Sequence, residues 1–355
     1  MKFSGIGGQA VLEGIMMRNK NKYCIAVRKE DGTIASKTEH TVPFSATHKW
    51  GKTPFIRGTV SLVESLSVGM KTIMWSSEPD KKEDEKELSK GENIGTVLLA
   101  VVLALGIFVA LPMVISSFLQ KIPFFCEREW LVKIIEGVLR LLIFIGYVLL
   151  TSLLKDIRRT YMYHGSEHKC INCLEHGLPL TVDNVMKSSK EHRRCGTSFL
   201  LIVMLISILL FMLVPLPKIT LASAGLSTVV TKLAGFGIRI LLIPVVAGIA
   251  FEVLQFTGKH DNLFTRIISR PGMWMQALTT KEPTPDMVEV AIVAVENVFD
   301  WRAFLRENFP GVEIPEPEKV TMDADAETQE AEGNCEAETG AFGCGCSEES
   351  TEKED

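Results

Sequence analysis

Four long apolar stretches constrain the fold of this chain more than any other feature. Each is close to the length that a helix needs to cross the hydrocarbon core of a bilayer. Because a membrane offers no water to unpaired peptide groups, such stretches must be helical. We therefore predict a mainly α membrane protein with about four transmembrane helices, at residues 94–119, 134–154, 199–214 and 229–254.

The distribution of positive charge predicts how these helices are oriented. Eight Lys and Arg lie in the segment 155–197. Only two, Lys218 and Lys232, lie after the third stretch and before the apolar part of the fourth. Loops rich in Lys and Arg stay in the cytoplasm. We therefore expect the 155–197 loop and both chain termini to be cytoplasmic, in a multi-pass protein with the lipid bilayer as its partner.

The segments outside the apolar stretches differ in composition. Residues 1–58 are rich in glycine near their start and contain Asp31-Gly32, a pair typical of hairpin turns. We therefore predict a small β-rich cytoplasmic unit there. Residues 313–355 hold 15 Asp and Glu against 2 Lys, a net charge of −13. The other predicted segments are an amphipathic or interfacial helix at 59–77, a charged linker at 78–93, a membrane domain at 94–254, a cytoplasmic interfacial segment and helix at 255–310, and a disordered acidic tail at 311–355.

Two of the predicted spans contain charged residues. Glu136 and Arg140 lie four positions apart in the second span, and Arg239 lies in the fourth. Counting roughly 1.5 Å per residue from the expected cytoplasmic ends places the two arginines at similar depth. Charges inside a membrane need partners, so we predict that Arg239 contacts Glu136.

A polar motif that follows the second span predicts metal chemistry. It reads His164-Gly-Ser-Glu167-His168, and Glu175 follows seven residues later. On a helix these four residues share one face. Two imidazoles at i and i+4 can bind one metal ion, beside a carboxylate that acts as general base. We therefore predict a divalent metal site, with zinc the favoured ion, His164 and His168 as ligands and Glu167 as the catalytic base.

Other groups compete for the remaining ligand positions. We expect the second span to continue as one long helix through residue 176, because the first helix-stopping signals are Gly177 and Pro179. Both ends of the 155–197 loop then lie at the membrane surface. The candidates for further metal ligands there are Glu175, His192, Cys195 and Glu252.

Two other interpretations of the motif stay open. Cys170-x-x-Cys173 together with His192-x-x-Cys195 has a spacing close to that of closed structural zinc sites. This alternative accounts for the cysteines but not for the H-x-x-E-H pattern. In the other interpretation no metal is bound, and the histidines lie on the polar face of a surface helix.

Four motifs taken together resemble one bacterial family. They are GGQAVLEGIMMR at 7–18, YHGSEHK at 163–169, HRRCGTSF at 192–199 and RPGMWMQ at 270–276. This set is similar to the YqhQ-like bacterial membrane proteins, a family of unknown function whose members are sometimes labelled predicted metal-dependent enzymes. The resemblance covers roughly residues 1–305 and implies a protein of the bacterial inner membrane.

Two classes of function are compatible with these expectations. The first is a membrane-bound, metal-dependent hydrolase or peptidase that works at the cytoplasmic face. The second is a non-catalytic membrane factor, such as an assembly or translocon-associated protein, in which the polar face or a zinc site is structural. Besides the bilayer, the expected partner is another protein or a second copy of the chain. We expect no specific nucleic acid as a partner.

Overall fold

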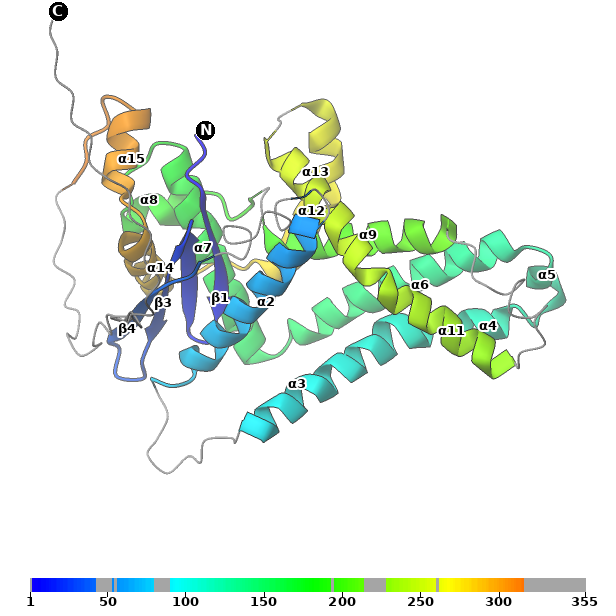
Figure 1. Cartoon of the computed structure of the whole chain (residues 1–355). Helices are drawn as coiled ribbons and strands as arrows, with labels where there is room; N and C mark the ends of the chain where they lie inside the picture. The colour runs from blue at the N-terminus through cyan, green and yellow to red at the C-terminus, as the bar shows by residue number, and fades with distance from the viewer. Residues whose placement is uncertain are drawn as a thin grey trace, which may run out of the picture. The chain divides into compact units, whose positions relative to one another are not determined.

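The computed structural model describes residues 2–42, 53, 56–79, 90–192, 195–213, 228–259 and 262–315 (Figure 1). Most of the predicted linker and the predicted acidic tail beyond residue 315 lie outside these ranges. Helices predominate among the described residues, as the sequence predicts. They are α2 (Ile56–Ser76), α3 (Lys90–Leu105), η2 (Gly106–Ala110), α4 (Leu111–Leu119), α5 (Pro123–Cys126), α6 (Glu129–Thr151), α7 (Lys155–Glu175), α8 (Val182–Lys187), α9 (Gly196–Leu213), α11 (Thr228–Leu241), α12 (Ile243–Lys259), α13 (Leu263–Thr279), α14 (Pro285–Val298) and α15 (Trp301–Asn308).

The N-terminal segment forms a four-stranded antiparallel sheet in the order β1-β2-β3-β4. The hairpin predicted at Asp31-Gly32 is confirmed, because this turn joins β3 to β4 with Gly32 at a φ of 88°. In the turn between β1 and β2, Glu13 pairs through both carboxylate oxygens with Arg159 of α7. The strands are β1 (Ile6–Val11), β2 (Gly14–Asn19), β3 (Lys22–Arg28) and β4 (Ile34–His40).

Helices cover both faces of this sheet, because apolar side chains point to both sides of its strands. One face presents Ile15 and Met17 to a core that it shares with α7 and α14. The other face presents Met16 and Ile25 to α2, which contributes Val68. Figure 1 shows α2 on one side of the strands and α14 on the other. The sheet therefore holds α7, which carries the H-x-x-E-H motif, in a fixed position.

Three helical stretches are long and apolar enough to cross a membrane. They are Ile94–Leu119 (α3, η2 and α4), Trp130–Thr151 (α6) and Leu233–Thr257 (α11 and α12). The third predicted span, at 199–214, corresponds to α9. Its described apolar part, Phe199–Leu210, is shorter than a span, and residue 214 lies outside the described residues.

The prediction of one continuous helix from the second span through residue 176 is wrong. α6 ends at Thr151 and α7 begins at Lys155, with Leu154 in an extended conformation at ψ 132°. The hydroxyls of Thr151 and Ser152 donate to main-chain carbonyl oxygens one turn earlier, and such bonds compete with the regular helix pattern. Because of this break, α7 packs on the sheet and α14 instead of extending α6.

Three charged residues of the candidate spans form one group, which we call the span cluster: Glu136, Arg140 and Arg239. The predicted contact is confirmed, since Arg239 Nη2 lies 2.8 Å from Glu136 Oε1. Arg140 Nη2 lies 3.3 Å from the same oxygen, and Arg140 Nε donates to the carbonyl oxygen of Phe108 in η2. One carboxylate thus bridges two guanidinium groups from helices far apart in the sequence.

Candidate metal centre

The C-terminal half of α7 is buried on every side, from Tyr163 to Glu175. Its apolar side joins the core beneath the sheet, while its polar side faces the chain before α9 and the end of α13. Gly165 permits this close packing: a Cβ atom at this position would lie 2.0 Å from the main-chain oxygen of Lys281. The main chain after α13 therefore crosses directly over α7, one residue away from His164.

His164, His168 and Cys195 come together on the polar side of α7. One ligand atom from each lies within 4.8 Å of those of the other two. The Nε2 atom of His164 lies 3.1 Å from the sulfur of Cys195, and the two imidazole rings are 4.4 Å apart between centroids. All three side chains are buried. Two nitrogens and one sulfur in this arrangement form a ligand set that suits zinc.

Main-chain carbonyl groups orient both imidazoles. His164 Nδ1 lies 2.9 Å from the oxygen of Thr279, and His168 Nδ1 lies 2.7 Å from the oxygen of Lys190. A carbonyl oxygen only accepts, so each Nδ1 carries the hydrogen and each neutral ring presents a lone pair at Nε2. Burial lowers the pKa of His168, which favours the neutral ring. The interaction with Cys195 acts on this pKa in the opposite direction to burial, and the Nε2 atom of His168 is buried.

Glu167 lies beside this group and is covered by β1. Burial raises the pKa of its carboxyl group, whereas the proximity of His164 and a hydrogen bond from the main-chain N–H of Gly8 act in the opposite direction. Gly8 makes the approach of β1 possible, because a Cβ atom there would lie 3.1 Å from the Glu167 carboxyl carbon. The carboxyl group is thus held next to the histidines, in surroundings that favour its protonated form.

Glu175 and His192 lie next to this group but outside it. Glu175 Oε1 accepts hydrogen bonds from the main-chain nitrogen and the hydroxyl of Ser4, at 3.1 and 3.0 Å. Glu175 Oε2 lies 3.7 Å from His192 Nε2, and the His192 ring lies 5.8 Å from the His168 ring between centroids. Gln276 fixes the main chain of His192 through two hydrogen bonds. These two predicted ligands therefore form a second layer behind His168.

Glu252, another predicted ligand, has a different partner. Its carboxylate forms a two-point ion pair with Arg57 at the start of α2, with Nε and Oε1 separated by 2.7 Å. It does not belong to the group formed by His164, His168 and Cys195. The sequence predicted Glu252 as a metal ligand and did not identify Arg57 as its partner.

The alternative four-ligand zinc site is not assembled. Cys170 and Cys173 belong to the apolar core on the other side of α7. Cys173 Sγ lies 3.4 Å from the carbonyl oxygen of Pro179, and burial raises its pKa to about 12. Burial also raises the pKa of Cys170. Both groups are therefore core thiols, and only Cys195 of the proposed four-ligand set joins the histidines of α7.

Comparison with known proteins identifies the family of this chain. A family model described as "Protein of unknown function (DUF1385)" matches residues 53–301. The chain belongs to this family. It is also 35% identical over 319 residues to the uncharacterized protein YqhQ of Bacillus subtilis (strain 168), and the match covers 85% of this chain and 94% of that relative. No solved structure matches the chain.

Sequence reasoning missed the main-chain groups that position the site. The carbonyl groups of Lys190 and Thr279 orient the histidines, and the N–H of Gly8 meets Glu167. Every residue has a main-chain carbonyl group, so the type of residue does not reveal which carbonyl groups contact the site. The sequence indicates these contacts only indirectly. The Gly-Gly pair at 7–8 and Gln276 both lie within the four motifs that resemble the family.

Proposed function

We propose that the chain is a multi-pass protein of the bacterial cytoplasmic membrane that binds one zinc ion on its cytoplasmic side and catalyses hydrolysis there. The observation that carries the proposal is the convergence of His164, His168 and Cys195, with both Nδ1 atoms held by carbonyl oxygens. Three protein ligands are the number that catalytic zinc sites use, since a fourth position stays open. The high Lys and Arg content of residues 155–197 supports the cytoplasmic assignment.

The roles of the residues follow from their positions. His164, His168 and Cys195 bind the ion, which supplies Lewis acidity and makes a water molecule more acidic. Glu167 moves the proton, because its carboxyl group lies beside His164 and burial raises its pKa. Glu175 and His192 position His168 from behind. The order H-x-x-E-H is that of metallopeptidases with an inverted zinc motif, so a peptide bond is the first substrate class to test.

The proposal is tested first by the metal content of the purified full chain. We expect about one zinc ion per chain in the unmodified protein and its loss in His164→Ala/His168→Ala and in Cys195→Ser. His176→Ala is the matched control, because His176 lies at the end of the same helix and bonds to Asn172 instead. Cys170→Ser/Cys173→Ser should also keep the metal. Unmodified protein that binds no zinc would contradict the proposal.

Catalysis is tested separately with Glu167→Gln. A hydrolase should cleave an unfolded protein such as casein, lose that activity in Glu167→Gln, and keep its zinc and its fold. Glu191→Gln is the control, because Glu191 also lies in the segment 155–197 but its side chain is exposed. If the unmodified chain binds zinc but does not cleave casein, peptide hydrolysis is ruled out under those conditions.

A specific observation favours a second candidate, a non-catalytic membrane factor with a structural zinc site. The three ligands and Glu167 are all buried, and β1 covers Glu167. Burial of these groups restricts the access of a substrate to the site, which favours a structural role for the ion. For such a factor, Glu167→Gln leaves cellular function unchanged, whereas loss of the metal unfolds the unit formed by α7 and the sheet.

A further inference from the structure

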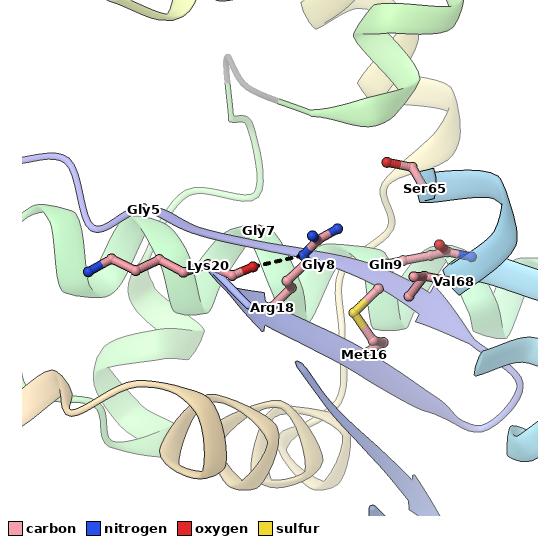
Figure 2. Close-up of a pocket in the computed structure, with 9 residues that line it drawn as sticks. All are labelled: Gly5, Gly7, Gly8, Gln9, Met16, Arg18, Lys20, Ser65 and Val68. Atoms are coloured by element: carbon pink, nitrogen blue, oxygen red, sulfur yellow. Dashed lines mark hydrogen bonds between the residues drawn. The ribbon is translucent and has the colours of Figure 1, made fainter. Parts of the chain in front are cut away.

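A second polar site lies on the sheet, apart from the metal ligands. It is a pocket of about 350 Å³ between the start of β1, the turn from β2 to β3, and α2. Figure 2 shows the glycines of β1 along one side of it, with Ser65 and Val68 of α2 across from them. Its lining residues include Gly5, Gly7, Gln9, Arg18, Lys20 and Ser65.

Glycines give the pocket its open floor. A Cβ atom at Gly5 or at Gly7 would have no other atom within 4 Å. Gly5 also has a φ of 74°, and Lys20 in the opposite turn has a φ of 51°, a conformation that residues other than glycine rarely adopt. A ligand can therefore approach the main chain of β1 closely.

The charges of the pocket are of one sign. Arg18 Nε donates to the main-chain oxygen of Lys20 at 3.1 Å, as the dashed line in Figure 2 shows, and this bond fixes the guanidinium group at the pocket. Within the described part of the chain, neither Arg18 nor Lys20 forms an ion pair with a carboxylate. Two cations without an acidic partner at a concave site favour an anionic ligand.

The neutral groups of the pocket are also donors. Ser65 contributes an exposed hydroxyl from α2, and Gln9 contributes its amide, which packs against Gly69. No Asp or Glu lines the pocket. A guanidinium, an ammonium, a hydroxyl and an amide around a glycine floor form the donor set that recognises phosphate oxygens.

The helix on the far side of the pocket connects it to the spans. α2 packs on α12 at Gly58, where a Cβ atom would lie 2.7 Å from Phe251. Near the pocket, α2 exposes the apolar side chains of Val63, Leu66 and Met70. An exposed apolar row beside a cationic pocket, on a helix that touches a candidate span, suits a lipid whose headgroup carries a phosphate.

We propose that this pocket binds the phosphate group of an anionic ligand, with Arg18 and Lys20 as its charged contacts and a phospholipid headgroup as the source that the exposed row of α2 favours. This site does not depend on the metal centre. A soluble phosphate ester offers the same chemistry, and the experiment separates the two sources.

The test measures lipid binding to the full chain in detergent by native mass spectrometry. Phosphatidylglycerol is compared with diacylglycerol, which has the same acyl chains but no phosphate, and inorganic phosphate is added as a competitor. We expect the unmodified chain to retain phosphatidylglycerol and not diacylglycerol. Arg18→Gln/Lys20→Gln should weaken retention by about tenfold or more, since charge-assisted hydrogen bonds are lost.

Two further variants keep the proposal falsifiable. Gly7→Leu fills the open floor but leaves both charges in place, so it should weaken binding as well. Lys155→Gln/Arg158→Gln removes the same two residue types from exposed positions of α7 and should change binding by less than about twofold. Circular dichroism checks that all variants are folded.

Each outcome of this experiment either supports or overturns the proposal. Displacement of the lipid by inorganic phosphate assigns the pocket to a soluble phosphate ligand, and resistance to displacement assigns it to the lipid headgroup; both support a phosphate site. Equal retention of diacylglycerol overturns the proposal. So does unchanged binding of both phosphatidylglycerol and inorganic phosphate in Arg18→Gln/Lys20→Gln and Gly7→Leu, or an equal loss in Lys155→Gln/Arg158→Gln.

Discussion

Two clusters of buried polar side chains in this molecule are stabilised in different ways. In the span cluster, side chains of opposite charge pair directly, because Glu136 lies between Arg140 and Arg239. In the candidate metal centre, the side chains are imidazoles and a thiol that can be neutral, and the outer nitrogens of the imidazoles bond to main-chain carbonyl oxygens. The first arrangement pairs opposite charges that the chain itself supplies. The second directs lone pairs toward a common point, which is what a cation requires.

The largest effect is expected when the span cluster loses its carboxylate. Glu136→Gln leaves Arg140 and Arg239 buried without this counter-charge, and removing one partner of a buried ion pair costs about 3–5 kcal/mol. Thermal unfolding of the detergent-solubilised chain measures this loss. The exposed Glu127→Gln serves as control.

A charge swap sharpens the same comparison. Glu136→Arg/Arg239→Glu keeps the contact but exchanges its ends, so it should recover part of the stability that either single change loses. No recovery would show that the surroundings of each position, and not the contact itself, determine its stability.

Removal of metal should give the next largest effect. If zinc is present at about a thousand times its Kd, chelation lowers the free energy of unfolding by about 4 kcal/mol. His168→Ala, which lacks a ligand, should unfold at the same temperature with and without chelator. A chelator effect of equal size in both proteins would place the metal elsewhere.

A smaller effect is expected from the strand that covers Glu167. In Gly8→Ala the new Cβ atom would lie 2.7 Å from the Met16 oxygen and 3.1 Å from the Glu167 carboxyl carbon, and such overpacking costs about 1–3 kcal/mol. Gly7→Ala, one residue earlier, meets no atom within 4 Å and should change stability by less than about 0.5 kcal/mol. Equal effects at both positions would contradict the packing that we describe.

The smallest effect is expected at the surface link between α7 and the sheet. Arg159 and Glu13 form a two-point pair, but both side chains are substantially exposed. Exposed pairs contribute about 0–1 kcal/mol, so Arg159→Gln should lower the unfolding temperature only slightly. A loss as large as that of Glu136→Gln would mean that this pair, rather than burial, fixes α7.

Features that depend on local pattern were predictable from the sequence. The apolar runs located three candidate spans, the Asp-Gly pair located a hairpin, and the spacing of His164 and His168 placed them on one helical face. The contact between Arg239 and Glu136 was also predictable, because a membrane limits buried charges to a few partners at similar depth.

Only the tertiary structure decided which residues complete the site. Four candidates lay near the predicted loop, and Cys195 alone joined the histidines, while Glu175 and His192 formed a second layer and Glu252 paired with Arg57. The break between α6 and α7 was equally hidden, because neither proline nor glycine marks it. The physical reason is that helical spacing is a local property, whereas ligand choice depends on where the chain returns after Lys190 and Thr279, and packing between distant segments sets that path.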